Sequence, residues 1–261
     1  MSSMPQVSVV VPMRNESANV QPLAARVAAA FADSSFSPME LILVDDGSTD
    51  DTWQQILLAR RELAHLRAVR HAASVGQSAA LWTGFKASRA ELIATLDGDL
   101  QNDPADLPRM LKQLQDCDMV CGVRARRADN FVRRASSQIA RSARKWVLGV
   151  DFADAGCNLR VFRRSVLETL PAFDGIHRFM PILAHNAGAI VKEVAVVHHP
   201  RTEGKSKYGV WNRLGRGLCD LLMVRWFLKR QIGRTSTRTQ PGLNPLAAEK
   251  LAPSSNIAAI L

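Results

Sequence analysis

Apolar and polar positions alternate in blocks along the first half of the chain. Short runs rich in Val, Ile, Leu and Ala are separated by longer segments that carry apolar residues on one helical face. A continuous apolar run of this length is typical of a strand that is buried on both faces, whereas the longer segments are typical of amphipathic helices. The runs predict strands at residues 7–11, 40–44, 66–70, 92–96 and 119–122.

The segments between these runs predict helices at residues 17–32, 50–63, 76–88 and 104–115. Strands that alternate with helices of this length form βαβ units around a parallel sheet. We therefore expect an α/β fold with a mostly parallel central sheet flanked by helices.

The second half is less regular. Its pattern predicts helices at 133–148 and 209–232, strands at 157–163 and 190–197, and a polar loop at 198–208. From about Gly233 the chain is rich in Ser, Thr and Pro without a sustained period, which predicts a flexible tail over 233–261.

Composition agrees with one folded domain. The 261 residues are 47% apolar and 22% charged, which is the usual range for a globular protein. The five-residue apolar run near the start ends at Pro12 and is too short for a signal peptide, and no stretch is long enough to span a membrane. Four cysteines without metal-ligand spacing predict neither a disulfide framework nor a zinc site, so we expect a cytoplasmic location.

Charge is unevenly distributed. The formal net charge is +10, and the excess lies in residues 121–150, with eight basic residues and one acidic, and in 196–240, with ten and two. This favours an anionic partner such as phosphate, anionic lipid or nucleic acid, although solvated helix faces would give the same count. With 6% aromatic residues and no aromatic residues interleaved in a basic stripe, nucleic acid is the least favoured of these partners.

Carboxylates follow two of the predicted strands. Asp45 and Asp46 follow the second strand, and Asp97 and Asp99 follow the fourth, with Gly98 between them. In open α/β sheets ligands bind at the carboxyl ends of the strands. In an extended segment Asp97 and Asp99 would face the same way, and two close carboxylates are stabilised by a divalent cation. Turn or cap residues are the alternative interpretation.

Motifs of other nucleotide-binding folds are missing from the sequence. It contains no GxGxxG, no GxxxxGK[ST] and no GxSxG. These absences disfavour a dinucleotide oxidoreductase, a P-loop NTPase and an α/β-hydrolase. A nucleotide bound here would be held by carboxylates, a metal ion and basic side chains.

A basic loop is the second chemical feature. Arg201, Lys205 and Lys207 surround Gly204, and small neighbours let the three cations converge on a phosphate. An exposed turn is the alternative. The adjacent His198 and His199 are expected to be structural, because nothing near them in the sequence completes a ligand set.

Several motifs, in order, resemble those of family 2 glycosyltransferases, in particular the polyprenyl-phosphate branch that resembles dolichol-phosphate mannose synthase. The resemblance covers about residues 5–230. It is carried by the segments VSVVVPMRNE, LILVDDGSTDDT, GQSAALWTGF, LDGDLQNDP, CGVRARR, GCNLRVFRR and PRTEGKSKYG.

The resemblance implies a single GT-A type, Rossmann-like domain over 1–232, with a nucleotide-binding half at about 5–122 and an acceptor-side half at about 123–232. It further implies roles for individual residues. Nucleotide-sugar contacts would come from Pro12, Arg14, Glu16, Val44, Asp46, Asp97, Gly98, Arg124 and Lys207. Asp99 and Gln101 would hold Mg²⁺ or Mn²⁺, Arg124, Arg201, Lys205 and Lys207 would bind the acceptor phosphate, and Asp97, Asp99 and Arg201 would be catalytic.

The implied reaction is an inverting, metal-dependent transfer of a sugar from a nucleotide-diphospho-sugar to a polyprenyl (undecaprenyl or dolichyl) phosphate, for cell-envelope glycan or glycolipid synthesis. An acceptor phosphate is already ionised near neutral pH and needs no strong general base. The alternative is transfer to a sugar hydroxyl in polysaccharide synthesis, which would need a carboxylate base. Asp151 and Asp154 are the candidates for that base.

Many members of this branch carry transmembrane helices, so the last predicted helix is of interest. It has Trp211, Leu214, Leu218 and Leu221 on one face. Such a helix suits a membrane interface, with packing on the core or on a second subunit as the alternative. We therefore expect peripheral association with the inner face of the cytoplasmic membrane, and allow for a homo-oligomer. A predicted loop with His177, Arg178 and Phe179 could gate the acceptor or simply pack on the surface.

Overall fold

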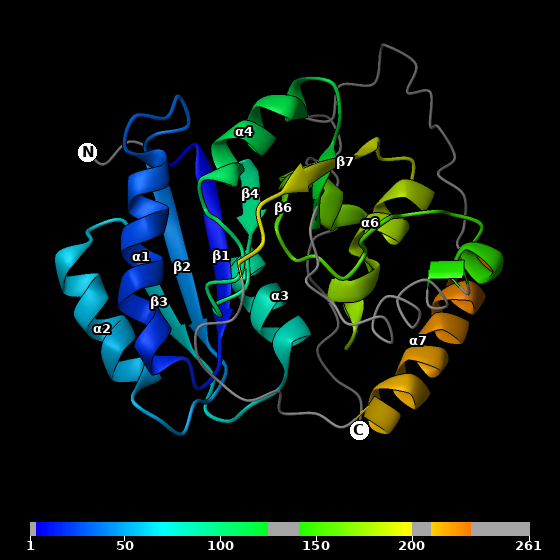
Figure 1. Ribbon diagram of the computed structural model, residues 1–261, viewed down its shortest axis with the longest axis horizontal. Helices are drawn as coiled ribbons and strands as arrows, with labels where there is room; N and C mark the ends of the chain where they lie inside the picture. Colours follow the sequence, from blue (N-terminus) through cyan, green and yellow to red (C-terminus); the bar gives the residue numbers. More distant parts are fainter. Residues whose placement is uncertain (1–3, 125–140, 143, 200–209, 231–261) are drawn as a thin grey trace, which may run out of the picture. The chain divides into compact units, whose positions relative to one another are not determined.

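The computed structural model describes residues 4–124, 141–142, 144–199 and 210–230, and for residues 210–218 it describes the backbone alone. Its centre is a seven-stranded sheet with the order β3-β2-β1-β4-β6-β5-β7 (Figure 1). The strands are β1 (Val7–Met13), β2 (Met39–Asp45), β3 (Leu66–Arg70), β4 (Leu92–Thr95), β5 (Met119–Arg124), β6 (Arg160–Arg163) and β7 (Val191–Val196).

All seven predicted strands are confirmed, and the sheet is mostly parallel. The pairs β1–β2, β1–β4, β2–β3 and β5–β7 are parallel. Strand β6 is antiparallel to both of its neighbours, β4 and β5. This reversed strand brings the segment before residue 160 to the edge of the sheet where β4 ends.

Helices cover both faces of the sheet. They are α1 (Ser17–Phe31), α2 (Thr52–Glu62), α3 (Gln77–Ala87), α4 (Asp106–Lys112), α6 (Ile176–Asn186) and α7 (Val210–Arg230), with 3₁₀ turns at Gln113–Gln115 and Arg164–Thr169. Alternate residues of β1 point to opposite faces. Val9 belongs to the apolar cluster on the face covered by α1, α2 and α4, whereas Val10 belongs to the cluster on the face covered by α3, α6 and α7. Burial on both faces explains the continuous apolar runs.

The structure corrects one expectation in the second half. His177, Arg178 and Phe179, expected in a loop, lie in the first turns of α6. The helix contains Pro181, which cannot donate a hydrogen bond to the carbonyl four residues earlier. That carbonyl, of His177, instead accepts a hydrogen bond from Nη1 of the buried Arg160 at 2.6 Å. A side chain from a distant strand thus provides the hydrogen bond that the helix lacks at its proline.

Three predicted segments lie wholly or mostly outside the described residues, including the polar loop at 198–208, of which only residues 198–199 are described. The expected tail at 233–261 is one of them, and of the expected helix at 133–148 only residues 141–142 and 144–148 are described, as helix. None of the described helices is both long and apolar enough to cross a lipid bilayer.

Candidate active site

Loops from three adjacent strands meet at the carboxyl edge of the sheet. Strand β1 lies between β2 and β4, so the segments that follow these strands are neighbours. Two hydrogen bonds join the segment after β1 to the segment after β2. The main-chain N–H of Asn15 donates to Ser48 Oγ at 2.9 Å, and the main-chain N–H of Thr49 donates to Asn15 Oδ1 at 2.9 Å. The predicted motifs around Arg14 and Asp46 thus form one continuous rim.

Asp46 is buried and accepts four hydrogen bonds. Its donors are the ring Nδ1 of His71 (2.9 Å), the hydroxyl of Ser74 (2.7 Å) and the main-chain N–H groups of Val75 and Gly76 (both 2.9 Å). Burial alone would raise the pKa of Asp46, but these hydrogen bonds outweigh it and hold the pKa below its ordinary value. The carboxylate therefore fixes the turn between β3 and α3.

Asp97 is held from two sides. Its Oδ1 accepts from Gln77 Nε2 at 2.8 Å and from Asn158 Nδ2 at 2.9 Å, and its Oδ2 lies 3.2 Å from the same Asn158 nitrogen. Burial and the negative charge of Asp99 raise the pKa of Asp97 to about 6. Two carboxylates are thus close enough to repel each other, as the sequence predicted.

The segment that joins these carboxylates is a turn and not the extended segment that we expected. Strand β4 ends at Thr95, residues 98–99 form a turn, and Leu100 has a φ of +60°. Asp99 Oδ1 accepts from the main-chain N–H of Gln101 at 3.2 Å. A Cβ on Gly98 would lie 2.4 Å from Met13 Sδ and 3.2 Å from the carbonyl oxygen of Pro12, so a larger residue here would force the Met13 side chain to move.

The oxygen-bearing side chains at this turn are of the kind that bind a hard divalent cation. Asp99 and Gln101 supply side-chain oxygen atoms, and the charge of the Asp97–Asp99 pair would be offset by a cation. Among the described residues there is no group of three or more His, Cys, Asp or Glu that could enclose a metal ion by itself. Mg²⁺ characteristically takes one or two carboxylates and completes its shell with water and substrate phosphates, so an open site of this kind suits it.

The end of β7 lies against the same turn. His198 forms a β-bridge with Asn102, and the main-chain N–H of His199 donates to the carbonyl of Gln101 at 2.8 Å. His199 Nε2 also lies 3.3 Å from Asp103 Oδ2. Residue 199 is the last described residue before 200–209, so the predicted phosphate ligands Arg201, Lys205 and Lys207 lie outside the described residues.

Arg124, at the end of β5, makes a two-point ion pair with Asp154. Its Nε donates to Oδ2 at 2.6 Å and its Nη2 donates to Oδ1 at 2.8 Å. Asp151 pairs with Arg141 at 2.6 Å and Lys145 at 3.1 Å, and these hydrogen bonds lower the pKa of Asp151 to about 2. Both candidates for a general base are therefore engaged by cations.

The remaining predicted nucleotide contacts differ in exposure. Arg14 is exposed, Pro12 and Glu16 are half-buried, and Val44 is fully buried in the core. Their contacts with a nucleotide stay predictions. Sequence reasoning missed the side chains of Gln77 and Asn158, although it noted the segments that contain them.

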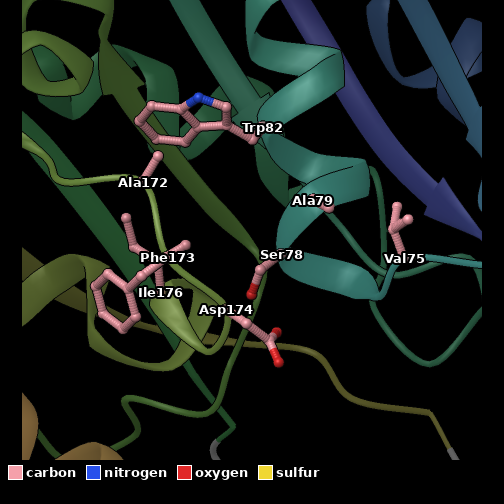
Figure 2. A pocket seen from close by; sticks show the side chains of 8 residues that line it. All are labelled: Val75, Ser78, Ala79, Trp82, Ala172, Phe173, Asp174 and Ile176. Atoms are coloured by element: carbon pink, nitrogen blue, oxygen red, sulfur yellow. The ribbon is translucent and has the colours of Figure 1, made fainter.

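A pocket of about 220 Å³ lies between the first turns of α3 and the segment that precedes α6 (Figure 2). Ser78 and Asp174 approach each other at one side of it, and Trp82 and Phe173 contribute aromatic surface. Ser78 Oγ accepts from the main-chain N–H of Gly175 at 2.9 Å and contacts His177 Nδ1 at 2.7 Å. Burial and two nearby arginines lower the pKa of His177 to about 3, so the ring is neutral and this contact is structural.

Comparison with known proteins agrees with this geometry. Residues 8–170 match the model of glycosyl transferase family 2. The chain is 41% identical over 235 residues to dodecaprenyl-phosphate galacturonate synthase of Rhizobium johnstonii, covering 86% of this chain and 68% of the relative. It is 38% identical over 210 residues to undecaprenyl-phosphate 4-deoxy-4-formamido-L-arabinose transferase of Pseudomonas aeruginosa, covering 80% and 62%. The aligned part is therefore about two thirds of the length of these relatives.

Solved structures show the same fold at low sequence identity. A mannosyltransferase from Pyrobaculum calidifontis in complex with GDP-Man and Mn²⁺ superposes with a TM-score of 0.60 at 21% identity, covering 85% of this chain and 64% of that one. Glucosyl-3-phosphoglycerate synthase from Mycobacterium tuberculosis, in complex with Mg²⁺ and UDP, gives 0.62 at 20% identity, covering 85% and 79%. The predicted GT-A fold is confirmed. With a family model matched over more than half of its length and relatives at 41% and 38% identity, the chain belongs to glycosyltransferase family 2.

Proposed function

We propose that the protein transfers a sugar from a nucleotide-diphospho-sugar to a polyprenyl phosphate, with inversion at the anomeric carbon. The observation that carries this proposal is the hydrogen bond between His199 and Gln101. It joins the carboxylate turn, where a donor diphosphate would bind, to the start of the segment that contains Arg201, Lys205 and Lys207. Asp99, Gln101 and His199 lie together, and we propose that Arg201, Lys205 and Lys207, which follow His199 in the sequence, bind the acceptor phosphate at this site.

On the donor side, Asp99 and Gln101 would hold Mg²⁺ or Mn²⁺. The bound metal would neutralise the departing nucleoside diphosphate, which is the main requirement of glycosyl transfer from such donors. Arg124, oriented by Asp154, would add a positive charge beside the phosphates. Asp97 would accept a hydrogen bond from the donor.

On the acceptor side, the chemistry favours phosphate over a sugar hydroxyl. Asp151 and Asp154 are both paired with cations, and the pKa of Asp151 is about 2, so neither is suited to remove a proton from a hydroxyl. An ionised phosphate attacks without a base. Both relatives described above are named for a polyprenyl phosphate.

A lipid acceptor requires contact with a membrane, and α7 offers a surface for it. Leu221 and Val224 pack into the core. The helix face with Leu221, which the sequence suggested for the membrane, is therefore partly buried in the protein. The opposite side exposes Leu222, Met223 and Trp226, followed by Lys229 and Arg230. Trp226 is 58% exposed, and Trp146 is 85% exposed in the neighbouring helix, where Arg225 donates to the carbonyl of Val147. Aromatic and basic residues together suit the inner, cytoplasmic face of an anionic membrane.

The test is transfer of label from UDP-, GDP- and dTDP-sugars into an organic-extractable product made from undecaprenyl phosphate, with Mn²⁺ or Mg²⁺. The panel includes nucleotide-linked galacturonate and 4-deoxy-4-formamido-L-arabinose. We expect metal-dependent label in the organic phase, abolished by EDTA and by Asp99→Ala. If folded protein transferred no sugar to the lipid but did transfer it to a saccharide hydroxyl, the proposed acceptor would be wrong.

A further inference from the structure

The two oxygen atoms of the Asp97 carboxylate are in different environments. Oδ1 accepts two short hydrogen bonds, at 2.8 Å from Gln77 and at 2.9 Å from Asn158. Oδ2 has one longer contact, at 3.2 Å, with the Asn158 nitrogen that already serves Oδ1. A carboxylate oxygen has two lone-pair directions, so Oδ1 is filled whereas Oδ2 keeps capacity for another donor.

The position of Gln77 is fixed by its surroundings. It is the first residue of α3 and follows Gly76, whose φ of +100° turns the chain into the helix. The main-chain N–H groups of Val75 and Gly76 are both held by Asp46 at 2.9 Å. The buried carboxylate at the end of β2 therefore sets the direction from which the Gln77 amide reaches Asp97.

Asn158 is fixed independently, from the other side of Asp97. It is buried, and its carbonyl accepts from the hydroxyl of Thr95 at 2.7 Å. Two residues later, Arg160 pairs with Thr95 in the β4–β6 register and binds the carbonyl groups of Ala155 and His177 at 2.9 and 2.6 Å. The residues that lead into the antiparallel strand β6 thus hold the Asn158 amide in place.

We propose that Gln77 and Asn158 are positioning residues for sugar transfer, which fasten Oδ1 of Asp97 and leave Oδ2 to accept a hydrogen bond from a hydroxyl group of the donor. This inference rests on the proposed function. Each amide can donate to a carboxylate and neither carries charge, so the pair fixes the orientation of Asp97 without neutralising it. Two anchors from separate elements restrict rotation of the carboxylate more than one anchor would.

The test compares Gln77→Ala and Asn158→Asp with the wild-type chain in the transfer assay. Asn158→Asp keeps the shape of the side chain but replaces its donor with a like charge. We expect kcat to fall about tenfold to a hundredfold in each variant, with the KM for undecaprenyl phosphate unchanged, since a hydrogen bond to a charged group is lost. Asn186→Asp is the matched control, because within the described part of the chain the Asn186 side chain donates to the carbonyl of Ile182 at the far end of α6, and the activity of this variant should equal that of wild type.

A binding cycle shows whether Gln77 acts through Asp97. Calorimetry measures affinity for the transferred nucleotide sugar, with Mn²⁺, in wild type, Gln77→Ala, Asp97→Ala and the double variant. We expect Gln77→Ala to weaken binding in the wild-type background and to have no further effect once Asp97 is alanine. The proposal would be wrong if the effects of Gln77→Ala and Asp97→Ala on affinity were independent and multiplied, or if Gln77→Ala kept the wild-type kcat. If Asn158→Asp does not fold, the results for Gln77→Ala alone test the proposal. Failure of the proposed function differs from both, since the wild-type chain would then transfer no sugar, and the inference would fall with it.

Discussion

Arg124 binds both carboxylate oxygens of Asp154, through Nε at 2.6 Å and Nη2 at 2.8 Å. Asp154 is buried, and its main-chain N–H donates to Glu193 on β7 at 3.3 Å. A two-point pair of this kind fixes the plane of the guanidinium, which a single contact would not do. The direction of this cation is therefore set by a residue thirty positions further along the chain.

Asp154→Asn should weaken catalysis by releasing Arg124. The variant keeps one acceptor but removes the charge, so we expect about tenfold lower kcat/KM for transfer to undecaprenyl phosphate and a loss of about 1–3 kcal/mol in the free energy of unfolding. Asp116→Asn is the control, because the Asp116 side chain is 80% exposed and lies 3.7 Å from Lys192 in a surface pair. Wild-type kinetics in Asp154→Asn would show that the orientation of Arg124 does not matter for transfer.

Asp97→Asn should separate stability from activity. Burial and the charge of Asp99 raise the pKa of Asp97 from 3.8 to about 6, so the ionised form is less favourable in the folded protein than in the unfolded chain. This penalty is absent below the unfolded pKa, grows as the pH rises from about 4 to 6 and is complete above that range.

In the absence of metal, we therefore expect Asp97→Asn to be more stable than wild type at pH 7.5, by up to about 3 kcal/mol, and nearly equal at pH 4. The same variant should lose transfer activity. Urea unfolding in EDTA at the two pH values measures the difference. A variant that is less stable by the same amount at both pH values would contradict this account of Asp97.

Asp46→Asn should destabilise the fold. The carboxylate accepts four hydrogen bonds that together lower its pKa, so its contribution to stability is present above the ordinary pKa of 3.8 and is lost as the pH falls through the lowered value. At pH 7 we expect a loss of about 2–4 kcal/mol, because an amide would turn an N–H group toward one of the donors. The exposed Asp33, changed to Asn, is the control. The gap between Asp46→Asn and wild type should narrow below pH 4, and a gap that does not depend on pH would argue against an ionised Asp46.

Changes on the exposed face of α7 should reduce membrane binding without unfolding the protein. Leu222 and Trp226 are exposed, so replacing both with Ser removes apolar surface that is not part of the core. Flotation with phosphatidylglycerol vesicles should show binding of the wild-type chain and at least about tenfold weaker binding of the double variant, given that each buried large side chain contributes roughly 1.5–3 kcal/mol. Leu58→Ser on α2, also an exposed leucine, should bind as wild type does. If vesicles had no effect while the double variant changed from dimer to monomer in sedimentation, this face would bind a second copy instead.

The sequence by itself was sufficient to locate the seven strands and the helices α1 to α4 and α7. Strands β1 and β2 are buried along nearly their whole length, and helices such as α1 bury one side, so the periodicity of apolar residues indicates them well. It also placed Asp46 and Asp97 at strand ends, because polar residues that interrupt buried apolar runs are found where strands emerge from the core. Family membership followed from motifs of this kind, since each is a short local segment.

Only the tertiary structure showed what surrounds those carboxylates. Asn158 reaches Asp97 because β6 is antiparallel, and a short apolar run has the same pattern in either direction. Helix α6 forms around Pro181 because Arg160 satisfies the carbonyl that the proline cannot. The segment after β4 is a turn in which Gly98 lies close to Met13, where an extended segment was expected. Each of these features depends on a partner that is distant in sequence, whereas hydrophobic periodicity records that a side chain is buried but not which residue it meets.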